Sequence, residues 1–190
     1  MKKMSIAASA CIALIACPLS ANAAISVYGN SLAKICYVAA QGTISDTVAL
    51  EACTNAIEQM PLSVHDRAAT YINRGILRAR LGQPDLALDD YNHGLSLDGD
   101  LGEGYVDRGA VEISQRQFDT ALADINKGIS LNANELEIAY YDRAVVDEAM
   151  GNIKAAYYDY KKAVELQPTF QLANQQLTRF RVVHKGSDGT

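Results

Sequence analysis

One pattern of large, small and charged positions recurs three times along the chain. The pattern of Tyr71–Gly75 returns at Tyr105–Gly109 after 34 residues and at Tyr140–Ala144 after 35 more, with the tyrosine and the arginine unchanged. Beyond each segment a small, a large and a second small residue recur together: Ala87, Tyr91 and Gly94; Ala121, Ile125 and Gly128; Ala156, Tyr160 and Ala163. A repeat of this period predicts a stack of helix pairs, each burying its apolar side against the next.

The small residues predict where the two helices of each pair cross. Gly75, Gly109 and Ala144 fall on the first helix, where a larger side chain would hold the helices apart. The large residue of the second helix then fills the space beside the crossing. Pro84 suits the first turn of a second helix, because its missing N–H costs nothing there.

These columns resemble the tetratricopeptide-repeat family. Its helix-turn-helix unit carries a large and then a small residue on the first helix, and small, large and small residues on the second. Three units match, at residues 68–101, 102–135 and 137–170, a little over half of the chain. The resemblance implies an all-α fold: a superhelix of antiparallel helix hairpins with a capping helix at its C-terminal end.

Less regular segments flank the three units. Residues 24–67 are expected to form a degenerate first hairpin, with a first helix over about 31–41 and Cys53 in a second-helix column. Residues 171–190 are expected to hold the capping helix, running to about Val183, and a loose tail. Terminal repeats are commonly atypical because they cover the ends of the core.

The family pattern is broken in one column, because the family usually has an apolar residue where Arg74, Arg108 and Arg143 stand. Each arginine is followed 16 residues later by an acid: Asp90, Asp124 and Asp159. A partly buried charge needs a partner, so we expect an Arg–Asp link between the two helices of each hairpin. Solvated charges and a ligand-binding pair are the alternatives.

The first 23 residues predict a secretory signal that is removed on export. Lys2 and Lys3 precede the uncharged, mostly apolar run Met4–Ala16, and Ala21–Ala23 supplies small residues for cleavage before Ala24. The apolar run is too short to span a bilayer. These features predict a periplasmic or secreted protein, and a buried N-terminal helix is the alternative.

The same segment is compatible with a second form of processing. Leu14–Cys17 resembles a bacterial lipoprotein box, in which Cys17 would carry a lipid anchor. Pro18 directly after that cysteine is unfavourable, so cleavage before Ala24 is the preferred interpretation.

Cys36 and Cys53 are the only cysteines after the expected cleavage point. In an oxidising compartment such a pair usually forms a disulfide. Cys36 aligns with the arginine column and Cys53 with the large second-helix column, which are 17 residues apart in every repeat. The two are therefore expected to face each other across the first hairpin. Two free thiols and a redox site are the alternatives.

Charge and motifs argue against several classes of function. Removing Lys2 and Lys3 with the signal leaves 15 of the 17 basic residues against 22 acidic ones, a net charge of −7. Nucleic-acid binding requires a basic surface instead. The sequence has no phosphate-binding loop, nucleophile elbow or zinc-protease motif, and its three histidines are scattered. We therefore expect no nucleic-acid partner, no metal, no cofactor and no enzymatic activity.

The family resemblance implies a binding role for the concave face, which the first helices line. Carried over by column, twelve residues are expected there: Ile72, Asn73, Ile76, Arg80, Val106, Asp107, Ala110, Ile113, Tyr141, Asp142, Val145 and Glu148. Such a groove could hold a helix or an extended peptide of a partner protein. The acids disfavour a carboxylate clamp, the family subtype that binds acidic C-terminal tails.

Two hypotheses for function follow. The first is an exported scaffold or adaptor that docks a protein of the cell envelope in its concave groove. The second is a lipid-anchored structural subunit of an envelope assembly complex, held to the membrane through Cys17.

Overall fold

The computed structural model describes residues 4–8, 24–26, 31–42 and 45–184. Most of these residues are helical. The helices are α1 (Ser31–Ala40), α2 (Asp46–Gln59), α3 (Val64–Arg80), α4 (Pro84–Leu97), α5 (Gly102–Ser114), α6 (Phe118–Ser130), α7 (Leu136–Ala149), α8 (Ile153–Leu166) and α9 (Gln171–Leu177). Two short strands, β1 (Met4–Ala8) and β2 (Phe180–His184), pair with each other.

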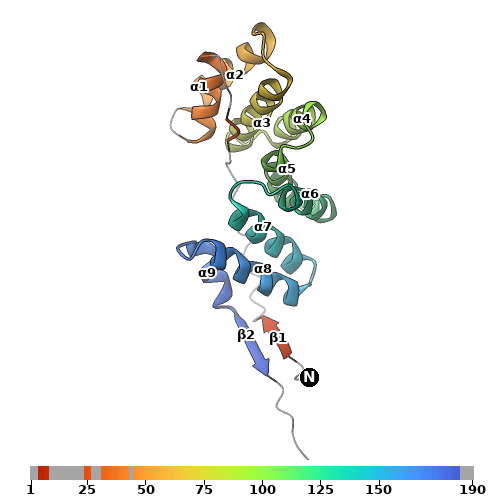
Figure 1. Cartoon of the computed structure of the whole chain (residues 1–190). Helices are drawn as coiled ribbons and strands as arrows, with labels where there is room; N and C mark the ends of the chain where they lie inside the picture. Colours follow the sequence, from red (N-terminus) through yellow and green to blue (C-terminus); the bar gives the residue numbers. More distant parts are fainter. Residues whose placement is uncertain (1–3, 9–23, 27–30, 43–44, 185–190) are drawn as a thin grey trace, which may run out of the picture.

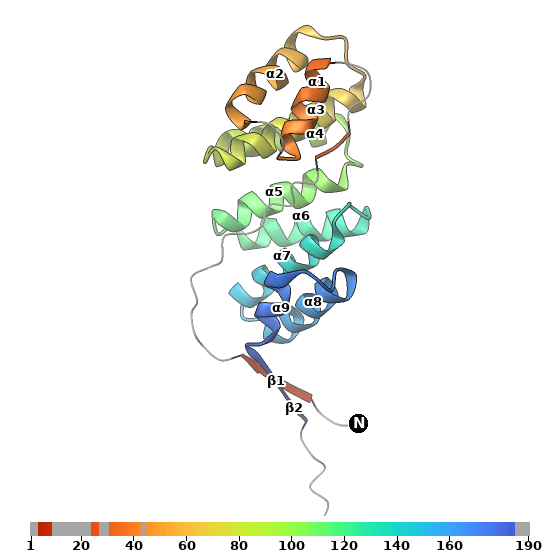
Figure 2. The same cartoon turned by 90° about the vertical axis from the view of Figure 1, so that its left-hand side faces the viewer.

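Consecutive helices pair into hairpins that stack in chain order, from α1–α2 at one end to α7–α8 at the other (Figure 1). α9 packs on α8 and continues the stack. A view turned by 90° shows one long column, with the helices lying across its axis (Figure 2). The predicted all-α superhelix of helix hairpins is confirmed.

Small residues set the distance between the two helices of a hairpin, as the sequence predicts. A Cβ on Gly75 would lie 2.6 Å from Cε1 of Tyr91, and one on Gly109 would lie 2.9 Å from Cγ1 of Ile125. Carbon atoms in good contact are about 3.5–4.0 Å apart, so neither glycine has room for a side chain. Tyr91 and Ile125 are fully buried, which confirms the predicted close crossings.

The turn inside a hairpin needs a residue in the left-handed conformation. Gly82 and Gly151 supply it with φ of 70° and 82°. Arg116 occupies the equivalent position between α5 and α6 with φ of 61°. A residue with a Cβ is less stable in this conformation than glycine by roughly 1 kcal/mol, so the α5–α6 turn is strained.

The first hairpin is closed by a disulfide between Cys36 on α1 and Cys53 on α2, whose Cα atoms are 4.9 Å apart. Both side chains are buried in a small cluster with Ala39, Ala49 and Leu77. Cys36 stands in the column of the later arginines, and Cys53 directly follows the column of the later aspartates.

The C-terminal end differs from the expected capping helix. α9 ends at Leu177 instead of near Val183, and β2 follows, antiparallel to β1. The sequence of β2 contains an aromatic and two β-branched residues, which favour an extended chain. Phe180 anchors the strand by packing its ring on Tyr157 and Tyr160.

The remaining terminal predictions are not tested by the fold. Apart from β1, the expected signal segment lies outside the described residues, and so do residues 185–190 of the expected tail. In the ranges that the structure describes, no helix combines the length and apolar character needed to cross a membrane.

Candidate functional site

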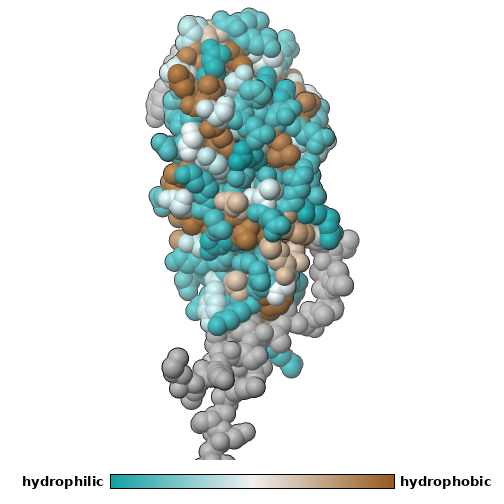
Figure 3. Space-filling model, turned by 90° about the vertical axis from the view of Figure 1, so that its right-hand side faces the viewer, coloured by the Kyte–Doolittle hydropathy of each residue, from teal (hydrophilic) through white to brown (hydrophobic). Residues whose placement is uncertain are grey.

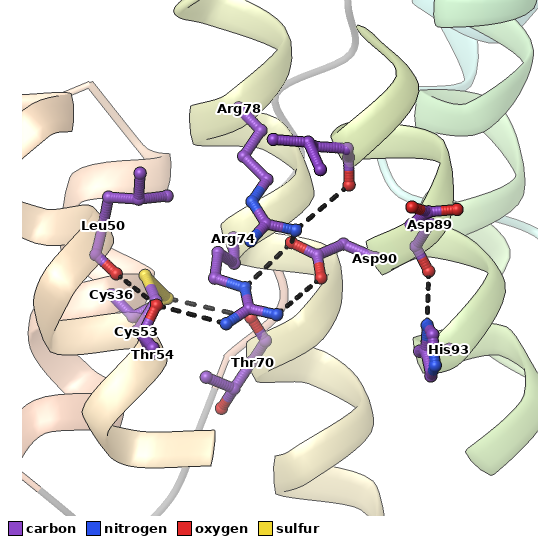
Figure 4. A network of polar contacts seen from close by, with 11 residues as sticks. Cys36, Leu50, Cys53, Thr54, Thr70, Arg74, Arg78, Asp89, Asp90 and His93 are labelled. Carbon is purple, nitrogen blue, oxygen red and sulfur yellow. Dashed lines mark hydrogen bonds and ion pairs between the residues drawn. A yellow bond between two sulfur atoms is a disulfide. The ribbon is translucent and has the colours of Figure 1, made fainter. Parts of the chain in front are cut away.

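Each repeat carries an arginine that binds the second helix of its own hairpin. Arg74 on α3 donates from Nε and Nη2 to the two carboxylate oxygens of Asp90 on α4, at 2.9 and 2.8 Å (Figure 4). Two-point pairing of this kind fixes both distance and orientation. The same atoms make the corresponding bonds in the next two hairpins at 2.5 to 2.9 Å, in the pairs Arg108–Asp124 and Arg143–Asp159. The predicted Arg–Asp links are confirmed.

The arginines also reach the preceding hairpin, which sequence reasoning missed. Nη1 of Arg74 donates to Oγ1 of Thr54 on α2, at 3.1 Å (Figure 4). The corresponding bonds are Arg108 to Asn92 and Arg143 to Asn126, both at 2.7 Å. The sequence did hold the signal, because each acceptor directly follows the column that holds Cys53, Tyr91 and Ile125.

Burial and neighbours show that these links are structural. The side chains of Arg74 and Asp90 are 11% and 2% exposed. Each arginine also lies over the tyrosine three residues before it, with 5.1 to 5.4 Å between guanidinium carbon and ring centroid. Since every arginine is engaged by both neighbouring second helices, the alternatives of solvated charges and a ligand-binding pair are both disfavoured.

Seven of the twelve residues expected in the groove belong to the core instead. Ile72 shows the reason: a Cβ on Gly94 would lie 2.7 Å from its Cδ1, and one on Gly104 would lie 2.8 Å away. Its side chain therefore fills the space between α4 and α5 rather than facing a groove. The others that are buried or packed against the core are Ile76, Val106, Ala110, Ile113, Tyr141 and Val145.

Two further groove candidates are used within the chain. Arg80 donates to the carbonyl oxygens of Ala39 and Ala40 and to Asp46, so it fastens α3 to the first hairpin. Glu148 accepts hydrogen bonds from the Tyr160 hydroxyl and from Arg179. Both were expected to face a partner, and both instead hold helices of the stack together.

The last three candidates form a row. Asn73, Asp107 and Asp142 stand at the same position of α3, α5 and α7, the first helices of successive hairpins. All three are fully buried. We refer to them below as the Asn–Asp row.

Asn73, the first member of the row, holds a segment of extended chain. Its Oδ1 accepts from the backbone N–H of Ile25 at 2.9 Å, and its Nδ2 donates to the Ile25 carbonyl at 2.8 Å. The side chain of Ile25 is buried in the core cluster that contains Ile72 and Ile76. The short segment 24–26 lies beside α3 (Figure 1). The amide of Asn73 thus satisfies both polar groups of one peptide residue.

Asp107 and Asp142, the other members, have no such partner. Neither carboxylate oxygen of either residue makes a hydrogen bond, and the buried hydroxyl of Tyr91 is also unpaired. Burial raises the pKa of Asp107 well above its ordinary value, and the charges of Glu135, Asp142 and Glu103 raise it further. Burial also raises the pKa of Asp142. A ligand that brings a positive charge or a hydrogen-bond donor would therefore stabilise the ionised form of both carboxyls.

The row has a small set of polar groups to offer a ligand. Among the described residues no group of three or more His, Cys, Asp or Glu side chains could hold a metal ion. The row offers one amide that pairs with backbone and two carboxylates that accept hydrogen bonds or pair with cations.

Comparison with known proteins supports this assignment of the fold. The family model for the tetratricopeptide repeat matches residues 138–170, the third of the predicted units. No curated protein matches the chain in sequence.

Solved structures resemble between about three fifths and four fifths of the chain. The crystal structure of MamA is 22% identical, with a TM-score of 0.62 over 80% of this chain and 82% of that one. The first TPR domain of human RPAP3 is 25% identical, with a TM-score of 0.57 over 61% of this chain and 90% of that one. The first TPR of Spaghetti, bound to the HSP90 peptide SRMEEVD, is 25% identical, with a TM-score of 0.55 over 58% and 89%.

Proposed function

We propose that this protein is an exported scaffold that binds a peptide segment of a cell-envelope protein along the Asn–Asp row. The observation that carries the proposal is the pair of hydrogen bonds between Asn73 and Ile25. In these bonds one side chain of α3 satisfies both the N–H and the C=O of a residue 48 positions away, which supports this face of α3 as a surface for peptide backbone. Equivalent positions on α5 and α7 extend the same surface.

The similar structures support peptide binding as the general role. The first TPR of Spaghetti is bound to an HSP90 peptide, and the second TPR domain of human RPAP3 is in complex with an HSP70 peptide. Both printed peptides, SRMEEVD and SGPTIEEVD, are rich in acidic residues. The two carboxylates of the row here disfavour such a peptide, so the partner differs in chemistry.

One face of the molecule gives little support for a broad apolar interface. On the face drawn in Figure 3, the described residues are mostly hydrophilic, and apolar side chains occur in small groups separated by polar ones. A large apolar patch would mark an extensive interface. The row therefore remains the better site for a partner.

Capture of partners from envelope extract tests the scaffold role. After chemical crosslinking, the wild-type chain is expected to capture a defined set of proteins. Asp107→Lys with Asp142→Lys should lose them while keeping the helical circular dichroism signal. A matched control, Asp119→Lys with Glu165→Lys, makes the same charge change at exposed positions. Equal capture by all three chains would refute a role for the row.

The mass of the purified N-terminus tests export and the form of processing. Cleavage before Ala24 gives a chain that begins at that residue and supports the exported scaffold. An acylated Cys17 would support the second hypothesis, the lipid-anchored subunit, which the Leu14–Cys17 box favours. An unprocessed chain beginning at Met1 would overturn the export proposal.

A further inference from the structure

Three of the buried polar groups that make no hydrogen bond lie on three successive hairpins. They are the carboxylates of Asp107 and Asp142 and the hydroxyl of Tyr91. Nearly all buried polar groups in folded proteins are hydrogen-bonded, because an unpaired one loses its hydration without compensation. Groups of this kind are satisfied when a ligand brings donors to them.

The first member of the row shows what form of ligand fits. Ile25 pairs with Asn73 through both of its backbone polar groups, which requires an extended segment that runs past α3. Asp107 and Asp142 stand at the equivalent positions of the next two first helices. A second extended segment would therefore meet the two carboxylates in turn as it passes α5 and α7.

The charges around the carboxylates indicate the side chains of that ligand. The charges of Glu103, Glu135 and Asp142 all act unfavourably on ionised Asp107. Arg80 is the cation that offsets them, but its guanidinium already binds the end of α1 and Asp46. The charged groups that act on Asp107 are thus mostly acidic, and a cationic ligand would balance them.

From these observations, and resting on the scaffold role proposed above, we propose that Asp107 and Asp142 bind an extended peptide with basic side chains. Lysine or arginine side chains of the peptide pair with the two carboxylates, and Tyr91 offers its hydroxyl to the same ligand. Because successive side chains of an extended chain point to opposite sides, every second residue of the peptide faces the row.

Cleavage before Ala24 makes that residue the first of the chain, directly beside the residue that Asn73 holds. Segment 24–26 then keeps the first position of the row, and the positions at α5 and α7 are left for the partner.

A defined peptide probe tests the proposal independently of any natural partner. The probe is a short fluorescent peptide of alternating lysine and alanine, compared by anisotropy with glutamate–alanine and serine–alanine peptides of the same length. The protein is the exported chain, with its N-terminus read by mass. We expect the lysine peptide to bind at least about tenfold more tightly than the other two.

Variants that keep shape but remove charge decide where the peptide binds. Asp107→Asn with Asp142→Asn should weaken the lysine peptide at least about tenfold. The control Asp119→Asn with Glu165→Gln removes two exposed charges and should change binding less than about twofold, since exposed charges are screened. Circular dichroism checks that each variant is folded.

Two results would overturn the inference. One is equal binding of the three peptides, and the other is an equal loss in the row variant and the exposed control, which would show attraction to the net charge alone. Capture of envelope proteins without any preference for the lysine peptide would leave the scaffold proposal standing and refute only the basic ligand.

Discussion

The crossing of α5 and α6 at Gly109 can be tested by filling the space that the glycine leaves. In Gly109→Leu the new Cβ would lie 2.9 Å from Cγ1 of Ile125 and 3.3 Å from the carbonyl oxygen of Ala121. The isoleucine can adjust its rotamer, but the carbonyl belongs to the backbone of α6 and moves only with the helix. The two helices must therefore separate.

The expected loss follows from two opposing effects. Overpacking a well-packed core costs about 1–3 kcal/mol, and the backbone contact places this site near the upper value. Leucine is favoured over glycine within a helix by roughly 1 kcal/mol. The net destabilisation is then about 2 kcal/mol, which lowers the melting temperature of a chain this size by roughly 4–8 °C.

A second substitution makes the test specific to the crossing. Ile125→Ala alone should cost about 2–5 kcal/mol, because it leaves a cavity. Combined with Gly109→Leu it should cost less than the sum of the two, since the leucine occupies the vacated volume. Thermal unfolding followed by circular dichroism measures all four chains. A wild-type melting temperature for Gly109→Leu, or strict additivity in the double variant, would refute the reasoning.

Three further changes test other parts of the structure. Reduction of the Cys36–Cys53 disulfide should remove about 3 kcal/mol from the first hairpin, so hydrogen exchange should rise over residues 24–60 before the later repeats. Arg116→Gly should raise stability by about 1 kcal/mol in urea unfolding, because it relieves the left-handed arginine. Burial and the charge of Asp124 raise the pKa of Glu112 from 4.5 to about 7, so its contribution to stability should fall as pH rises between these values; Glu112→Gln should remove that dependence.

Each of these has a control and a contrary result. Free thiols in protein alkylated during isolation would exclude the disulfide. The converse change, Gly82→Arg, should destabilise the α3–α4 turn. Unchanged stability in both variants would contradict the strain assigned to left-handed Arg116. For Glu112 the folded chain holds the proton more tightly than the unfolded chain, so the free energy of unfolding of the wild type should fall relative to Glu112→Gln as pH rises. A rise in this difference with pH would contradict the reasoning. Glu58→Gln, at an exposed position, is the matched control.

Contacts within a hairpin could be predicted from the sequence because they recur at fixed short spacings. The close crossings at Gly75 and Gly109 and the Arg–Asp links all join residues 16 positions apart. At that separation the geometry of a helix hairpin alone decides which residues meet. The cysteine pair, 17 positions apart, was assigned from the arginine column and the large second-helix column.

Contacts between hairpins required the tertiary structure, because they depend on how far each hairpin turns relative to the last. That turn places Ile72 between α4 and α5 rather than in a groove, and carries Arg80 to the end of α1. It also brings Ile25 to Asn73, across 48 residues.

The C-terminal strand and the burial of the Asn–Asp row also depended on the tertiary structure. A helical pattern continued past Leu177 in the sequence, yet the packing of Phe180 on α8 and pairing with β1 favour a strand. The sequence by itself determined a stack of hairpins with acids on its first helices. Only the folded stack decided that Asp107 and Asp142 are buried without partners, because burial is the sum of contacts from several hairpins and no single repeat encodes it.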